Sequence, residues 1–468
     1  MTRRKTKIIV TLGPATSSPE KIHDLISAGA GIFRLNMSHA THDGVREISH
    51  TIREQASALG IPVAILVDLQ GPSIRTGEVD GKLSLKKGAI VEFRNVDLAA
   101  SKPLSVTTNY DGLHNDVSVG DVMLVDNGEI HFRVLQIETG RLTCEVLTEG
   151  EMGSRRHINL PGIRVNLPPL TEKDMRDINL AAELDVDYIA ISFVRDAEHV
   201  VFLRSQLEAR DCKALIVSKI EDQEAVKHLT DIITQSDAIM VARGDLGIEV
   251  HIEELPVIQR NILRECARIG RKVIVATHML ESMIENPVPT RAEVSDVANA
   301  VFEQTDAVML SGETSIGRYP VKCVEMLDRI AKRIEREPGA GFFKEIELTT
   351  EKQFTVKSAV VLANSLENSC LIIFTARGIL ANFAAQQRPE HAEIFAFSPD
   401  DRVVRSLVLN RSVTPFQMEM ADHPEESIHR AVDLLRAHDL IESGNPIVIL
   451  SDILNREFDT DAILLRKA

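Results

Sequence analysis

The chain is poor in cysteine, and its five cysteines are scattered through 468 residues. No two of them have CxxC spacing, so the sequence predicts neither a disulfide framework nor a zinc site. A reducing cytoplasm is the compartment that fits this pattern best. The five are Cys144, Cys212, Cys266, Cys323 and Cys370.

Long apolar runs are also missing. No stretch approaches the ~18 apolar residues of a membrane-spanning helix. The basic start, residues 1–7, leads into a short strand-like run instead of the apolar core of a signal peptide. We therefore expect no membrane segment and no export signal.

Positive charge is scarce, with 53 Lys and Arg against 69 Asp and Glu and a formal net charge of -16. Nucleic acid or an anionic membrane would need a broad basic face, so neither is expected as a partner. An anionic substrate would have to be attracted by a local basic pocket. The length and the 44% apolar content are those of an ordinary enzyme with two to four domains.

Short apolar runs alternate with amphipathic stretches, which indicates parallel strands joined by crossover helices. Eight runs favour a closed (β/α)8 barrel, the TIM barrel, because open doubly wound sheets usually have fewer strands. Two separate open-sheet domains are the alternative. The runs cover residues 7–12, 31–37, 63–69, 188–194, 214–220, 238–241, 272–277 and 307–310.

Residues 72–168 interrupt the alternation of strands and helices. They contain alternating strand-like runs and tight turns such as Asp126-Asn127-Gly128, which predict an inserted antiparallel β domain. This domain would act as a lid over the barrel. Residues 1–71 and 169–340 would form the barrel, resuming with a helix over 171–184 that Thr171 caps. A linker at 338–341 precedes a C-terminal α/β domain, residues 341–468. Its strands are expected at 371–375, 393–397, 413–417, 446–450 and 462–465.

Polar residues follow the predicted barrel strands at the ends where enzymes of this class carry their catalytic groups. Side chains two apart on a strand share a face, so neighbouring polar positions would converge over the barrel mouth. The residues are Arg34, Asn36 and Ser38 after strand two, Asp68 and Arg75 after strand three, Lys219 and Glu221 after strand five, Asp245 after strand six, Thr277 and His278 after strand seven, and Ser311 and Glu313 after strand eight.

The strongest candidates for a metal and phosphate site are Lys219, Glu221 and Asp245. The first two would project the same way from one strand, and Asp245 stands between Gly244 and Gly247 after the next. Mg2+ commonly takes one or two carboxylates plus water and substrate oxygens, and the ammonium would face a phosphate held by that metal. The glycines leave backbone N–H groups open to a ligand. A solvated ion pair is the alternative reading of Lys219 and Glu221.

These residues lie within segments that resemble the pyruvate kinase family, from one end of the chain to the other. The resemblance implies the same barrel, an inserted antiparallel β-barrel domain and a C-terminal α/β domain. The segments are KIIVTLGPAT, FRLNMSHA, DLQGPSIRTG, INLPG, SKIED, SDAIMVARGDLGIE, THMLESM, PTRAEVSDVANAV and MLSGETSIGRYP.

The resemblance implies transfer of the phosphoryl group of phosphoenolpyruvate to ADP, giving pyruvate and ATP in glycolysis, by a cytoplasmic homotetramer. It also implies roles for individual residues. Glu221 and Asp245 would hold Mg2+, Lys219 would stabilise the phosphoryl group, Arg34 would bind it, and Gly244, Asp245 and Thr277 would hold the substrate carboxylate. The proton would be delivered by Thr277 and Ser311. The nucleotide would be contacted by Asn36, His39, Arg75 and Arg156. K+ would be bound by Asn36, Ser38, Asp68 and the Leu69 carbonyl.

The chain departs from the family pattern at several places. Ser73 stands where members that need K+ carry Glu and members that do not carry Lys, so without an internal cation we expect a need for K+. His157 replaces a usual glycine and would stiffen the hinge of the inserted domain. The loop at 375–380 lacks two hydroxyls of the family's sugar-phosphate site, and the tail at 445–468 lacks its glycine-rich loop. Activation by fructose bisphosphate is therefore not expected.

Two other functions fit parts of the pattern. One is a different Mg2+- and enolate-using barrel enzyme, such as an aldolase or carboxyl-lyase, from which ADP-dependent turnover would separate this chain. The other is a catalytically silent sensor or scaffold that binds phosphorylated ligands, which would show binding without turnover.

Overall fold

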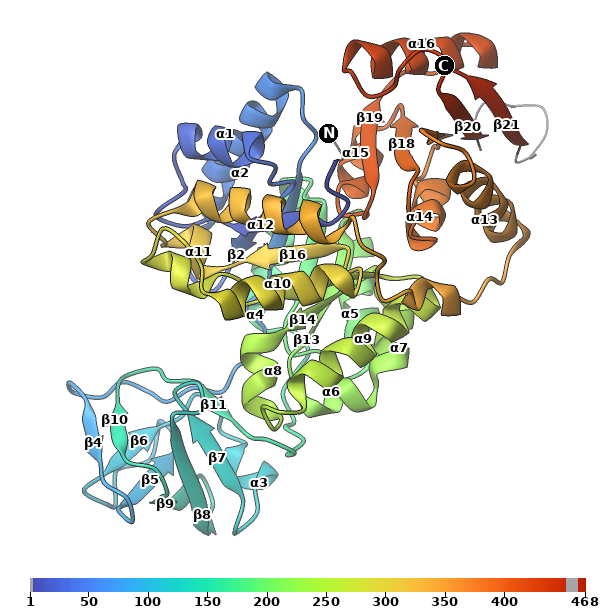
Figure 1. Cartoon of the computed structure of the whole chain (residues 1–468). Helices are drawn as coiled ribbons and strands as arrows, with labels where there is room; N and C mark the ends of the chain where they lie inside the picture. Colours follow the sequence, from blue (N-terminus) through green and yellow to red (C-terminus); the bar gives the residue numbers. More distant parts are fainter. Residues whose placement is uncertain (1–2, 452–461) are drawn as a thin grey trace.

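The computed structural model describes residues 3–451 and 462–468, and it has three parts. A central barrel lies between the inserted β domain and the C-terminal domain, which sit on opposite sides of it (Figure 1). Within the described residues no helix is both long and apolar enough to cross a membrane.

The barrel is closed and all its strands are parallel, in the order β1-β16-β15-β14-β13-β12-β3-β2. The eight runs predicted as strands are confirmed. Their apolar residues are buried on both faces, between the barrel interior and the surrounding helices, which explains why the runs are continuous instead of alternating. The strands are β1 (Lys7–Thr11), β2 (Ile32–Asn36), β3 (Ala64–Asp68), β12 (Tyr188–Ile191), β13 (Leu215–Ile220), β14 (Ala238–Ala242), β15 (Lys272–Ala276) and β16 (Ala307–Leu310).

The helices of the barrel part begin with side-chain caps at several points. Thr171 caps α4 through a capping box with Asp174, as its position before an apolar-periodic stretch predicts. The elements are α1 (Pro19–Ser27), α2 (His42–Leu59), α4 (Glu172–Glu183), α5 (Ala197–Glu208), α6 (Gln223–Lys227), α7 (Leu229–Gln235), α8 (Arg243–Glu249), α9 (Leu255–Ile269), η1 (Glu281–Ile284), α10 (Arg291–Phe302), α11 (Gly312–Ser315) and α12 (Pro320–Ile334).

The inserted domain, residues 72–168, lies between β3 and β12 in the chain and has its own apolar core. Its strands form a six-stranded sheet, β11-β7-β8-β9-β5-β6, and a two-stranded sheet, β10-β4. All the pairings are antiparallel except that of β5 with β6. The elements are β4 (Leu83–Leu85), β5 (Ile90–Arg94), β6 (Ser105–Thr107), α3 (Leu113–Asp116), β7 (Val122–Val125), β8 (Ile130–Glu138), β9 (Arg141–Val146), β10 (Gly150–Met152) and β11 (Ile158–Asn159).

A closed barrel in this domain is not confirmed. The segment that would close it is short: Arg75 bridges His157 beside β11, and Thr76 bridges Thr108 beside β6. Pro72 and Gly77 flank these two bridges, and neither residue type favours an extended ladder. The edges of the sheet are therefore joined by isolated bridges and not by a strand.

The C-terminal domain has a five-stranded sheet in the order β19-β18-β17-β20-β21, with only β21 antiparallel among the described strands. The five predicted strands are confirmed. The elements are η2 (Phe342–Glu345), α13 (Glu351–Asn364), β17 (Cys370–Phe374), α14 (Ile379–Gln386), β18 (Glu393–Ser398), α15 (Asp401–Leu407), β19 (Val413–Gln417), α16 (Pro424–Ala437), β20 (Pro446–Ser451) and β21 (Ala462–Lys467).

This domain packs on the N-terminal ends of the barrel strands. Arg405 Nε donates to Asp187 Oδ1 at 2.7 Å, and Arg388 Nη2 donates to Asp306 Oδ2 at 2.6 Å. Asp187 and Asp306 each precede a barrel strand, and both pairs are largely buried. The C-terminal ends of the strands are thereby left on the side of the inserted domain.

Candidate active site

Four charged side chains meet at the C-terminal ends of three barrel strands, β2, β3 and β13. Lys219 Nζ lies 2.8 Å from Glu221 Oε1 and 3.5 Å from Asp68 Oδ1. Arg34 Nε donates to Asp68 Oδ2 at 2.7 Å. The carboxylates are 1% exposed, Lys219 is 11% exposed and Arg34 12%, so water screens these charges poorly. A buried, nearly balanced group of two cations and two anions thus stands at the barrel mouth.

Two hydroxyls that the sequence interpretation missed tie this group together. Ser192, which directly follows β12, accepts a hydrogen bond from Lys219 Nζ at 2.8 Å and donates one to the Leu69 carbonyl at 2.8 Å. Thr11, at the end of β1, accepts from Arg34 Nη1 at 3.1 Å. The strand-end rule applied to the first and fourth strands would have found both residues.

The chain leaves the barrel for the inserted domain past Ser192. Gly71 has a φ of +69°, and a Cβ there would lie 2.9 Å from the Ser192 Cβ. Both the left-handed backbone and the close approach require glycine at this position. The start of the inserted domain is therefore held directly against the charged group.

The charges adjust one another's pKa values. Burial would raise the pKa of Asp68, but Lys219 and Arg34 outweigh it and hold that pKa below its ordinary value. Burial would likewise lower the pKa of Lys219, but Asp68 and Glu221 outweigh it and raise that pKa. Burial, together with Asp245, raises the pKa of Glu221 to about 7, against the opposing effect of Lys219. Lys219 and Asp68 are charged at neutral pH. The raised pKa of Glu221 shows that its present neighbours do not fully stabilise its negative charge, which a further cation would do.

A second cluster lies at the ends of β14 and β15. The Gly244 N–H donates to Thr277 Oγ1 at 2.8 Å, and Arg243 Nε donates to the Ala276 carbonyl at 3.1 Å. Thr277 and His278 have φ values of +68° and +54°, which are strained for residues other than glycine. The buried Arg243, paired with Asp296 at 2.7 Å, fixes the start of α8 to this strained turn. No motif in the sequence indicated that role for Arg243.

The remaining predicted site residues are less connected. Asn36 Oδ1 accepts the Ser38 N–H at 3.1 Å, and His39 is exposed. Ser311 donates its backbone N–H to Glu313 at 2.7 Å, and that carboxylate also holds the Leu280 N–H at 3.0 Å. In the described part of the chain, no contact joins Ser311 or His39 to the group around Lys219.

Arg75 and Arg156 belong to the inserted domain and are engaged within it. Arg75 Nε donates to Ser73 Oγ at 3.2 Å, and Arg156 Nη1 pairs with Asp126 at 3.2 Å. Nε of Arg156 is buried without a hydrogen-bond partner among the described residues. The position of the inserted domain relative to the barrel therefore determines how far these two arginines lie from the charged group around Lys219.

The carboxylates suit a metal that completes its shell with other ligands. Glu221 Oε1, although 2.8 Å from Lys219 Nζ, is buried and makes no directed hydrogen bond with any described residue. Asp245 lies close enough to raise the pKa of Glu221. Across residues 3–451 and 462–468 no three His, Cys, Asp or Glu are grouped to hold an ion alone. Two hard oxygen ligands plus water and substrate oxygens are the pattern that Mg2+ uses.

Comparison with known proteins places this geometry in a family. The model of the pyruvate kinase barrel domain matches residues 3–324, and that of the pyruvate kinase alpha/beta domain matches residues 353–464. The chain belongs to the pyruvate kinase family. Members of this family are phosphotransferases and are generally metal-dependent, and this chain is accordingly a phosphotransferase.

Individual pyruvate kinases are similar over nearly the whole chain. Plastidial pyruvate kinase 3 of Arabidopsis thaliana is 39% identical, over 99% of this chain and 82% of the relative. The pyruvate kinase of Geobacillus stearothermophilus is 38% identical, over 96% of this chain and 78% of the relative. A crystal structure of a pyruvate kinase from Cryptosporidium parvum superimposes with a TM-score of 0.93 at 32% identity, covering 99% of this chain and 96% of that one.

Proposed function

We propose that the protein transfers the phosphoryl group of phosphoenolpyruvate to ADP, giving pyruvate and ATP, as a glycolytic pyruvate kinase. The observation that carries this proposal is the ammonium of Lys219, held charged between two buried carboxylates beside a second cation, Arg34. Phosphoryl transfer needs positioning and charge neutralisation more than covalent chemistry by the protein. Two preorganised cations in a poorly screened site supply both.

Arg34 and Lys219 would bind the phosphoryl group from two sides. Arg34 uses Nε on Asp68 and Nη1 on Thr11, and Nη2 has no partner among the described residues. Lys219 is held by Ser192 as well as by its carboxylates, so little reorganisation is needed as charge moves. The N–H groups at the start of α8 and the Thr277 hydroxyl would hold the substrate carboxylate.

Mg2+ would be held by Glu221 and Asp245. When bound, it neutralises phosphoryl charge and raises the electrophilic character of the phosphorus. Glu221 Oε1 makes no directed hydrogen bond with any described residue, although Lys219 Nζ lies 2.8 Å away, and the pKa of that carboxyl is raised; both observations support this assignment. The proton of the keto product would reach the enolate through Thr277 with Ser311 nearby, a role that rests on the family resemblance.

The nucleotide would bind between the barrel and the inserted domain. Arg75 and Arg156 of the inserted domain and Asn36 and His39 of the barrel would contact it, as the family resemblance implies. Arg156 keeps one buried N–H without a partner in the described part of the chain, which leaves it able to bind a phosphate oxygen.

K+ would bind between Asn36, Ser38, Asp68 and the Leu69 carbonyl. Asn36 pairs with Asp68 across β2 and β3, so these two of the four residues are neighbours in the barrel. Ser73 accepts a hydrogen bond from Arg75 and brings no cation of its own. Hard oxygen ligands of this kind suit an alkali cation. The protein would act as a homotetramer in the cytoplasm.

The test is pyruvate formation from phosphoenolpyruvate with Mg2+, measured with and without ADP and with matched ATP detection. Stoichiometric pyruvate and ATP that both depend on ADP support the proposal. Pyruvate formed without ADP would mean that the phosphoryl group passes to water and not to a nucleotide. Absence of turnover would favour the enolate-using lyase or aldolase if phosphoenolpyruvate does not bind, and the silent sensor if it does.

A further inference from the structure

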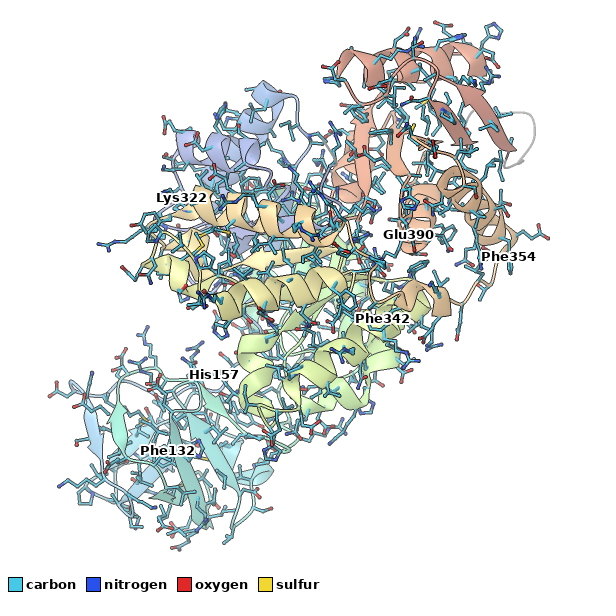
Figure 2. The ribbon with its side chains drawn as sticks, in the orientation of Figure 1. Phe132, His157, Lys322, Phe342, Phe354 and Glu390 are labelled. Carbon is cyan, nitrogen blue, oxygen red and sulfur yellow. The ribbon has the colours of Figure 1, made fainter. Side chains whose placement is uncertain are left out.

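One aromatic contact joins the inserted domain to the barrel near the charged group. The rings of His157 and Phe193 have centroids 5.7 Å apart and an interplanar angle of 57°. His157 directly precedes β11 of the inserted domain, whereas Phe193 follows β12 of the barrel. Figure 2 places His157 at the junction of the two parts. Both rings line the cleft there, together with Glu221.

Phe193 also orients Glu221. Its backbone N–H donates to Glu221 Oε2 at 2.7 Å, and its φ is +55°. Such a backbone is costly for a bulky residue and persists only where its surroundings hold it. The other oxygen, Oε1, lies 2.8 Å from Lys219 Nζ and makes no directed hydrogen bond with any described residue. The peptide of Phe193 therefore decides which way Glu221 faces.

The His157 ring is uncharged in this setting. Burial, assisted by Arg75, lowers its pKa to about 4, and the opposing effect of Asp245 is smaller. Arg75 faces His157 across an antiparallel bridge, so the two side chains share a face of the inserted domain. The contact with Phe193 is thus a tilted packing of two uncharged rings.

We propose that His157 is a positioning residue, whose ring packs on Phe193, holds the peptide that orients Glu221, and so prepares that carboxylate for the metal. The inference rests on the proposed function, since Glu221 is a metal ligand only there. The family resemblance puts a glycine at this position, so the ring is a feature of this chain. It links the placement of the inserted domain to the metal site.

The test uses the full chain without substrates and follows Mn2+ binding by electron paramagnetic resonance. The variants are His157→Ala, His157→Phe, Phe193→Ala and the double variant with both alanines. We expect His157→Ala and Phe193→Ala each to weaken Mn2+ binding by about 10-fold, as loss of an outer partner of a metal ligand does. The double variant should be no weaker than the singles, and His157→Phe should keep wild-type affinity because it keeps a ring.

A second readout needs no metal at all. Hydrogen exchange of the segment that contains the Phe193 amide should be faster in metal-free His157→Ala than in the wild type, and normal in His157→Phe. His131→Ala serves as the control, because among the described residues the side chain of that histidine of the inserted domain bonds only to the Gly128 carbonyl.

The outcomes separate the two proposals. Unchanged Mn2+ affinity and exchange in His157→Ala, or equal losses in His157→Phe, would overturn the positioning role while leaving the proposed function intact. A wild-type chain that binds no Mn2+ and forms no pyruvate would overturn both.

Discussion

A buried carboxyl at the end of α8 should make the stability of the protein depend on pH. Glu249 is 9% exposed, and its Oε1 accepts a hydrogen bond from Asn159 Nδ2 of the inserted domain at 2.8 Å. Burial, with smaller contributions from Asp222 and Asp245, raises its pKa to about 7 from an ordinary 4.5. In the folded chain this group therefore holds its proton at pH values where the unfolded chain has lost it.

The direction of the effect follows from that difference. Below pH 4.5 both states are protonated and Glu249 has no effect. Between pH 4.5 and 7 the folded state binds more protons, so stability falls as the pH rises, and above pH 7 the full penalty remains. The two pKa values of Glu249 correspond to a penalty of roughly 3 kcal/mol.

Glu249→Gln removes the charge and keeps an oxygen for Asn159. The melting temperature of the variant should lie several degrees above that of the wild type at pH 8. Each kcal/mol of stability shifts the melting temperature by roughly 2–4 °C in a domain of about 150–250 residues. The gain should shrink steadily toward pH 5. Thermal unfolding followed by circular dichroism across this range measures it. A gain that is constant with pH, or one that grows as the pH falls, would refute the reasoning.

Glu92→Gln is the matched control, with the opposite sign. Burial acts against its charge, but hydrogen bonds from Ser101, Ser105 and Arg141 outweigh it and hold the pKa of Glu92 at about 2. The charged Glu92 contributes its full stabilisation of the folded state above pH 4.5, and this stabilisation is lost only as the pH falls toward 2. This variant should be less stable than the wild type by an amount that does not change between pH 5 and 8.

Three further predictions concern turnover. Activity should fall several-fold when K+ is replaced by a bulky inert cation, and equal rates would show that the pocket near Ser73 needs no added cation. Fructose bisphosphate should leave the apparent substrate constant unchanged, because the loop at 375–380 lacks the family's hydroxyls, and a several-fold drop would contradict this. Thr277→Ala should lower kcat by about 10²-fold with a smaller change in KM, while Thr277→Ser should recover most of the rate, and a loss confined to KM would remove Thr277 from the proton path.

The barrel was predictable because its buried parallel strands read as continuous apolar runs, and all eight occur where expected. The convergence of Arg34, Asp68 and Lys219 was predictable for a related reason, since the C-terminal ends of parallel strands meet. The β-barrel expected for the inserted domain was not confirmed, because the edges of its sheet meet only at two isolated bridges, at Arg75 and Thr76.

Other features depend on tertiary contacts that no local pattern encodes. The peptide of Phe193 becomes important only because β12 lies next to β13, so that its N–H reaches Glu221. The strained turn at Thr277 and the role of Arg243 arise in the same way, from packing of α8 against a neighbouring strand end. The tail at 445–468 lies partly outside the described residues, so the expectation for its loop stays a prediction.

The central claim is that the buried ammonium of Lys219 stabilises a phosphoryl group in transfer. The most direct measurement is pyruvate formation from phosphoenolpyruvate and saturating ADP and Mg2+ by the wild type and by Lys219→Met, alongside phosphoenolpyruvate affinity. The Lys219→Met variant should show a fall in kcat of about 10³-fold or more with a much smaller loss of phosphoenolpyruvate affinity. A folded Lys219→Met protein that turns over at near the wild-type rate would contradict it.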